Sequence, residues 1–251
     1  MKARVRRTSS QWVVMALLFM VSYVHAEDRL DASAYQTTGL AHLEKGELDQ
    51  ALSAFTKALE LNPKNAEAYK NRGLAYERKG QDDHAFADYT KALELNPKYA
   101  EAYNNRGNVY VKKGQADRAI AEYNKALEIN PRRIEFYMNR GVVYWNGKDY
   151  DRAIADYNKA QDINPKDFRV YANRAFAYEG KGQYDQAIAD FTKALEINPQ
   201  HAETYNNRAL DYLYTKQYDK AWNDVGKAQA FGYPVDPAFL EALRNASGRN
   251  K

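Results

Sequence analysis

Charged and amide side chains recur in this chain with a fixed step of 34 residues. A Tyr-x-Asn-Arg segment begins at Tyr69 and returns at positions 103, 137, 171 and 205. An acidic residue follows each of these arginines after 16 residues. Such residues can form ion pairs, bind a peptide backbone through an amide group, or transfer protons between carboxyls.

The arginines and acids occur as pairs. The first 34-residue unit has Thr38 and Ala54 at the two places, so both members are present five times and absent together once. Because an unpaired buried charge is strongly destabilising, we expect each arginine to join the two helices of its unit through an ion pair. The alternative is that each arginine extends its charged end into solvent and leaves its stem on the core. The predicted pairs are Arg72 with Asp88, Arg106 with Glu122, Arg140 with Asp156, Arg174 with Asp190, and Arg208 with Asp224.

No set of residues predicts an enzyme. Outside the first 26 residues the chain has three histidines, His42, His84 and His201, far apart along the repeat, and it has no cysteine. Nucleophile motifs, metal-ligand spacings and phosphate-binding glycine loops are absent from the sequence. Carboxylates are frequent, but they recur with the repeat, whereas a catalytic pair breaks such a period. We therefore predict no catalytic residue, no metal site and no cofactor.

The first 26 residues have the pattern of an export signal. Lys2, Arg4, Arg6 and Arg7 precede an apolar run, and Val24 and Ala26 form a small-residue cleavage site. The apolar run is shorter than the ~20 residues of a membrane helix. We predict cleavage and a periplasmic or secreted protein; the alternative is an uncleaved membrane anchor.

Charge argues against nucleic-acid or anionic-membrane partners. The net charge of the chain is +4, and the four basic residues of the export signal account for all of it. The remainder is balanced between acids and bases, so it lacks the basic surface that such partners require. We expect no stable membrane span after signal cleavage.

The repeat predicts pairs of helices. Glycines such as Gly114 divide each unit, and prolines such as Pro131 close it, as expected at helix ends. Small residues recur at Gly73, Ala85 and Ala92, opposite the bulky Tyr89, which indicates closely packed helices. A short lead (27–31) precedes six units without insertions, at 32–65, 66–99, 100–133, 134–167, 168–201 and 202–235.

These features resemble the tetratricopeptide repeat (TPR) family: a 34-residue period with Gly73, Tyr76, Ala85, Tyr89, Ala92 and Pro97 at its characteristic places. The resemblance covers residues 32–235. It implies an all-α, right-handed α-solenoid of helix-turn-helix units, whose first helices line a concave groove. Residues 236–251 fit a C-terminal capping helix and tail, with Asp236 as N-cap and Pro237 as first helical residue.

An asparagine precedes each of the five arginines. In some TPR proteins a comparable ladder holds the backbone of an extended peptide, and a side-chain amide suits this role because it donates and accepts at once. The alternative is that the amides bridge neighbouring helices. The ladder consists of Asn71, Asn105, Asn139, Asn173 and Asn207.

Apolar residues on the first helices of the last three units are further binding candidates: Met138, Val142, Trp145, Phe176, Leu210 and Leu213. The corresponding places in units two and three are mostly polar, so we expect a groove that is polar in its first half and apolar in its second. The place of Trp145 holds Glu77 in unit two and Glu179 in unit five, so the fold does not require a tryptophan there. Packing against the final helix or a second copy is the alternative.

The sequence thus predicts a non-catalytic adaptor or scaffold that binds a protein or an extended peptide. The alternative is a self-associating structural protein that uses the apolar half of the groove or the last helix. A non-protein ligand such as cell-wall glycan is a third, weaker interpretation.

Overall fold

The structure of the protein, a computed structural model, describes residues 31–249 and divides into two units, one up to Val109 and one from Tyr110 onward. The predicted export signal and all but the last residue of the predicted lead lie outside the described residues. Between residues 31 and 249 the chain forms helices joined by short turns, without a strand. None of these helices has both the length and the apolar character needed to cross a bilayer.

The first unit contains a helix over residues 31–45 and the helices α2 (Leu48–Leu61), α3 (Ala66–Arg78), α4 (Asp82–Leu95) and most of α5 (Ala100–Lys112). The N-cap of helix α3 is Asn65, whose side chain accepts a hydrogen bond from the Ala68 amide at 3.0 Å. Helices α3 and α4 pack as an antiparallel pair around Tyr89, which is fully buried.

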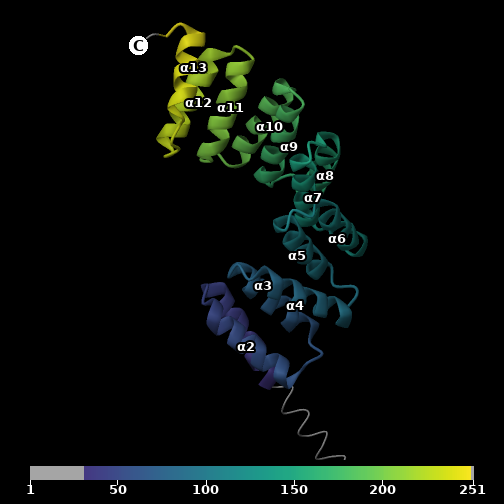
Figure 1. The fold of residues 1–251 in the computed structure, drawn as a ribbon. Coiled ribbons are helices and arrows are strands. Elements are labelled where there is room, and N and C mark those ends of the chain that lie inside the picture. The colour runs from purple at the N-terminus through teal and green to yellow at the C-terminus, as the bar shows by residue number, and fades with distance from the viewer. Residues whose placement is uncertain (1–30, 250–251) are drawn as a thin grey trace, which may run out of the picture. The chain divides into compact units, whose positions relative to one another are not determined.

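The second unit contains three helix pairs preceded by α6 and followed by a single helix (Figure 1). Each helix packs on the next one along the chain. The helices are α6 (Ala116–Ile129), α7 (Ile134–Asn146), α8 (Tyr150–Ile163), α9 (Phe168–Gly180), α10 (Tyr184–Ile197), α11 (Ala202–Tyr214), α12 (Tyr218–Ala230) and α13 (Pro237–Ser247).

Small residues let the two helices of a pair approach closely. Ala153 and Ala160 of α8 are fully buried beside Tyr157, which is 1% exposed. A Cβ atom added to Gly141 of α7 would lie 2.6 Å from the Tyr157 ring. The tyrosine ring therefore fills the space that the missing side chain leaves, as the small-opposite-bulky pattern predicts.

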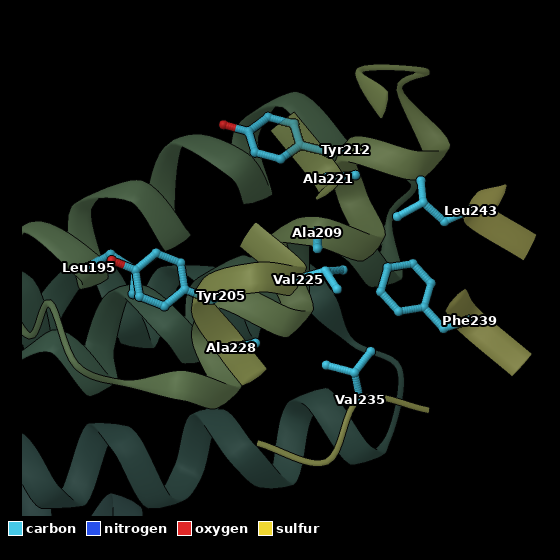
Figure 2. Close-up of a cluster of buried hydrophobic side chains, with 10 residues drawn as sticks. All are labelled: Leu195, Tyr205, Ala209, Tyr212, Ala221, Val225, Ala228, Val235, Phe239 and Leu243. Atoms are coloured by element: carbon cyan, nitrogen blue, oxygen red, sulfur yellow. The ribbon is translucent and has the colours of Figure 1, made fainter. Parts of the chain in front are cut away.

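The last helix covers the apolar end of the second unit. Phe239 and Leu243 of α13 are buried in a cluster with Val225, and Figure 2 shows the Phe239 ring directed at Val225. The Asp236 side chain accepts from the Ala238 amide at 2.8 Å, and Gly248 ends the helix with a left-handed φ of 69°. The predicted all-α architecture of stacked helix pairs is confirmed within each unit.

Candidate functional site

The arginines of the repeat lie against the acids 16 residues later. In α9 the Arg174 guanidinium donates from Nε to Asp190 Oδ2 at 2.7 Å and from Nη2 to Asp190 Oδ1 at 2.7 Å. The same two-point contact joins Arg72 to Asp88, Arg140 to Asp156, and Arg208 to Asp224. Arg106 and Glu122 belong to the same 34-residue repeat, but Arg106 lies in the compact part of the structure that ends at Val109 and Glu122 in the part that begins at Tyr110, so their pairing stays a prediction.

Each guanidinium also reaches the preceding repeat. Nη1 of Arg140 donates to Asn124 Oδ1 at 2.5 Å, and Nη1 of Arg208 donates to Thr192 Oγ1 at 2.8 Å. In the first unit, Arg72 contacts Thr56 in the same way at 3.3 Å. The arginine thus connects three helices rather than two, because its planar fork presents donors on two sides. This second contact was not part of the sequence prediction.

The asparagines of the ladder have different surroundings from one repeat to the next. Asn71 is 2% exposed; its Oδ1 accepts from Lys70 Nζ at 2.6 Å, and its Nδ2 has no hydrogen-bond partner among residues 31–249. Asn105 accepts from Asn104 Nδ2 at 3.2 Å. In the second unit, Asn139, Asn173 and Asn207 are half-buried. Their ligand-binding role stays a prediction.

One of these asparagines lines an apolar pocket. Its walls are Val142 and Trp145 of α7 and Asn173 and Phe176 of α9, and Tyr157 of α8 completes it. The pocket volume is about 240 Å³. Val142 and Trp145 are each 38% exposed, so the pocket opens to solvent. A single apolar side chain of a ligand fits a space of this size.

Two contacts hold the pocket walls. The indole N–H of Trp145 donates to the backbone carbonyl of Phe176 at 3.1 Å, which ties α7 to α9. The Trp145 and Phe176 rings are 6.4 Å apart between centroids, and Phe176 meets the buried Phe191 edge-on at 5.4 Å. The tryptophan is therefore positioned before any ligand arrives, which reduces the entropy lost on binding.

The other apolar candidates lie elsewhere. Met138 packs against the core cluster around Tyr157, and Leu210 and Leu213 pack against the C-terminal cluster that includes Phe239. The structure therefore brings together Val142, Trp145 and Phe176 of the six predicted side chains. Tyr157 occupies the repeat place of Tyr89, which the sequence assigned to packing, and it is both a core residue and part of the pocket.

A pair of carboxyl groups was missed by the sequence prediction. Asp211 of α11 is 1% exposed, and its side chain is hydrogen-bonded to Glu179 of α9. Burial and the neighbouring Glu179 carboxylate raise the pKa of Asp211 far above that of a free carboxyl. Burial also raises the pKa of Glu179. A sequence signal existed, because the place of Asp211 holds an apolar residue in the five other repeats: Ala41, Ala75, Val109, Val143 and Ala177.

The buried carboxyl pair makes the stability of the protein depend on pH. In the unfolded chain both carboxyls titrate near pH 4. The native pair retains protons at higher pH. The contribution of this pair to stability is therefore fully present below about pH 4 and is lost as pH rises through the raised native pKa values. We expect Asp211→Val to reduce this fall and to raise stability at pH 8 by about 1–3 kcal/mol, since it removes an unsatisfied buried group.

Urea denaturation of both proteins across pH 5 to 9 tests this expectation. An exposed acid on the same helix supplies the control, since Glu203→Gln removes one charge without touching the pair. The expectation is wrong if Asp211→Val leaves the slope of stability against pH unchanged.

No group of three or more potential metal ligands lies among residues 31–249. The site combines an open apolar pocket, a half-buried amide and a preformed tryptophan. The arrangement defines the molecule as a helical repeat protein with an open apolar pocket.

Comparisons with known proteins agree. A TPR repeat family model matches residues 39–80, 78–114 and 107–148, and a tetratricopeptide repeat model matches residues 134–167 and 168–201. The crystal structure of the MamA protein is 31% identical, with 69% of this chain and 94% of that chain covered and a TM-score of 0.59. The chain therefore belongs to the tetratricopeptide repeat family.

Two other solved structures are informative. YrrB, described as a TPR protein with an unusual peptide-binding site, is 28% identical, with 78% of this chain and 100% of that chain covered and a TM-score of 0.62. The pilF protein of Pseudomonas aeruginosa is 22% identical, with 88% and 99% covered and a TM-score of 0.75, which shows a shared fold. No curated protein matches this chain. TPR repeats indicate protein or peptide partners and an interaction or scaffold role.

Proposed function

We propose that the protein is an exported, non-catalytic adaptor that binds an extended peptide segment of a partner protein through the pocket of Val142, Trp145, Tyr157, Asn173 and Phe176. The single observation that carries this proposal is the open apolar pocket beside a half-buried amide. An apolar side chain of the peptide enters the pocket, and the Asn173 amide bonds the adjacent peptide backbone.

The magnitudes fit a modest affinity. Burying one leucine-sized side chain contributes about 1.5–3 kcal/mol. A net hydrogen bond from an amide contributes about 0.5–1.5 kcal/mol. Micromolar binding requires about 8 kcal/mol after the cost of ordering the peptide, so one pocket needs additional contacts along the groove. Asn139 and Asn207 are the ladder asparagines on either side of Asn173, and both lie in the same compact part of the structure.

Likeness to YrrB supports a peptide ligand, because that protein is described as having a peptide-binding site. The location is proposed from the sequence: the basic start, the apolar run and the small residues at Val24 and Ala26 are those of a cleavable signal. Cell fractionation followed by N-terminal sequencing tests it. An N-terminus at Glu27 in an extracytoplasmic fraction supports export, and an intact cytoplasmic chain contradicts it.

The binding test starts from a displayed library of random unstructured peptides selected on the full chain. The selected peptides are synthesised, and their dissociation constants are measured by fluorescence polarisation. We expect a shared apolar residue in the selected sequences. Trp145→Ala is expected to weaken binding about 30-fold or more, because a central tryptophan truncation typically costs about 2 kcal/mol or more.

Tyr214→Ala is the matched control, since Tyr214 is an aromatic residue that is 61% exposed and lies outside the pocket lining. Circular dichroism establishes that the variants have equal helicity. Equal loss of binding in both variants, or none in either, contradicts a peptide site at this pocket. Sedimentation at several concentrations distinguishes the alternative of self-association, which predicts a mass that rises with concentration.

A further inference from the structure

Asp211 stands at a place where the fold requires a small apolar residue. The second to fifth repeats hold Ala75, Val109, Val143 and Ala177 there, and these four are almost completely buried. Asp211 is equally buried, at 1% exposed, and its Oδ2 has no hydrogen-bond partner within the described residues. A carboxyl in such surroundings destabilises the helix stack, so packing does not account for it.

Its neighbour is a second acid rather than a base. Glu179 of α9 lies beside Asp211. Burial and the Glu179 carboxylate raise the pKa of Asp211, whereas burial raises the pKa of Glu179 and a hydrogen bond with Asp211 opposes that rise. Arg208 lies one turn before Asp211 on α11, but its guanidinium is held at two points by Asp224 of α12. Two such carboxyls cannot both ionise without a cation, so the pair holds a proton in its place.

The pair lies next to the apolar pocket. Glu179 is one helical turn after Phe176 on α9, and residues three apart on a helix are neighbours on its surface. Glu179 also occupies the repeat place that Trp145 occupies in the preceding unit. Glu179 is half-buried and therefore accessible from solvent, whereas Asp211 is buried.

We propose that the Glu179–Asp211 pair receives the cationic end of a lysine or arginine side chain of the bound peptide, one whose apolar side chain fills the neighbouring pocket. This inference rests on the proposed peptide-binding function and names the chemistry of the partner: a segment with an apolar and a basic residue a few positions apart. The observation behind it is a buried carboxyl oxygen, Asp211 Oδ2, that has no hydrogen-bond partner among residues 31–249 and lies on the helix packed beside the pocket.

The exchange is balanced in charge and protons. Between the raised pKa values of Glu179, about 7, and of Asp211, about 9, the pair of the free protein carries one proton and one negative charge. When an ammonium or guanidinium group enters, the proton leaves to solvent, and two carboxylates face one cation. Charge-assisted hydrogen bonds to both carboxylates then replace the single bond between them. Since binding releases a proton, affinity for the basic peptide rises with pH, by up to about tenfold per pH unit while the pair is protonated.

Capped six-residue peptides with one leucine in a serine and glycine background provide the test. A lysine is placed one, two or three residues after the leucine, and each peptide has a twin with Nε-acetyl-lysine, which keeps the stem and removes the charge. Binding to the full chain is measured by fluorescence polarisation at pH 6, 7 and 8. We expect at least one lysine peptide to bind tenfold more tightly than its twin at pH 8, with a smaller ratio at pH 6.

Variants separate the pair from general electrostatics. Asp211→Val restores the residue type that Val143 supplies in another unit, so folding is retained, and the preference for lysine over acetyl-lysine is expected to disappear. Glu179→Gln is expected to reduce it. Glu203→Gln removes an exposed acid from α11 and should leave the preference and its pH dependence unchanged.

Three results would overturn the inference. If lysine and acetyl-lysine peptides bind equally at every pH, the pair does not receive a cation, although the pocket still binds peptide. If the preference persists in Asp211→Val, another acid is responsible. If none of the peptides binds, the peptide-binding function of this pocket fails as well, so the two failures are distinguishable.

Discussion

Replacing Asp190 by alanine is expected to lower the free energy of unfolding by about 3–5 kcal/mol, the largest effect of any single substitution considered for this protein. The Asp190 side chain is 10% exposed and that of its partner Arg174 is 11% exposed. Removing the carboxylate leaves the guanidinium with neutral oxygens, since Nη1 donates to Asn158 and Gln161. A buried charge without its counter-ion accounts for the expected loss.

The paired replacement distinguishes a buried charge from lost packing. Arg174→Leu with Asp190→Leu is expected to recover most of the stability, because a buried ion pair and an apolar pair of similar volume are often close in energy. Urea denaturation of Arg174→Leu, Asp190→Leu, the double variant and the native chain gives the coupling energy. A coupling energy near zero would show that the pair contributes little.

An exposed ion pair on the same helix is the control. Lys193 and Glu196 of α10 are 50% and 58% exposed, and they contact each other at 2.8 Å. Because solvent screens such a pair, Glu196→Ala is expected to leave the urea midpoint unchanged. A shift comparable to that of Asp190→Ala would contradict the role assigned to burial.

The second large effect is steric. Gly141→Ala is expected to destabilise the chain by about 1–3 kcal/mol, because the new methyl group would meet the Tyr157 ring at 2.6 Å. The ring is buried between two alanines and has little room to move. Its displacement would also alter the pocket, which Tyr157 helps to line. Thermal and urea unfolding measure the first effect, and peptide affinity measures the second.

Gly226→Ala is the matched control. Gly226 lies inside α12, and nothing lies within 4 Å of the position that a Cβ atom would take there. Alanine favours helix over glycine by about 0.8–1.0 kcal/mol, so this variant is expected to be more stable than the native chain. If both substitutions change stability in the same direction, close approach at Gly141 is not the cause.

The arginine–acid pairing shows how far the sequence alone can lead. A period of 34 residues with both members always present together indicated a contact between the helices of one unit, since co-occurrence in a repeat reflects a repeated environment. The further bond from each guanidinium to the preceding unit was not foreseen. It depends on which side of the fork faces the neighbouring helix, and that follows from the stacking of whole units.

The apolar residues predicted to line the groove show what the sequence could not determine. Met138, Val142 and Trp145 share one helix face, yet Met138 packs on the core while the other two line a pocket. Leu210 and Leu213 occupy the places of Val142 and Trp145 in a later repeat, but they pack against the cluster that α13 completes. Periodicity gives the face of a helix; which residues on that face stay uncovered depends on the neighbouring units.

By itself, the sequence determined the family and the stacked helix pairs. Each unit encodes its own helix ends, its small residues and its bulky ring, and these interactions are local or between nearest neighbours. Only the tertiary structure decided where the pocket opens and that Asp211 meets Glu179. Both features combine side chains from helices of successive repeats, α7 with α9 and α9 with α11. The pattern within one 34-residue repeat does not tell which side chains of the next repeat lie beside it.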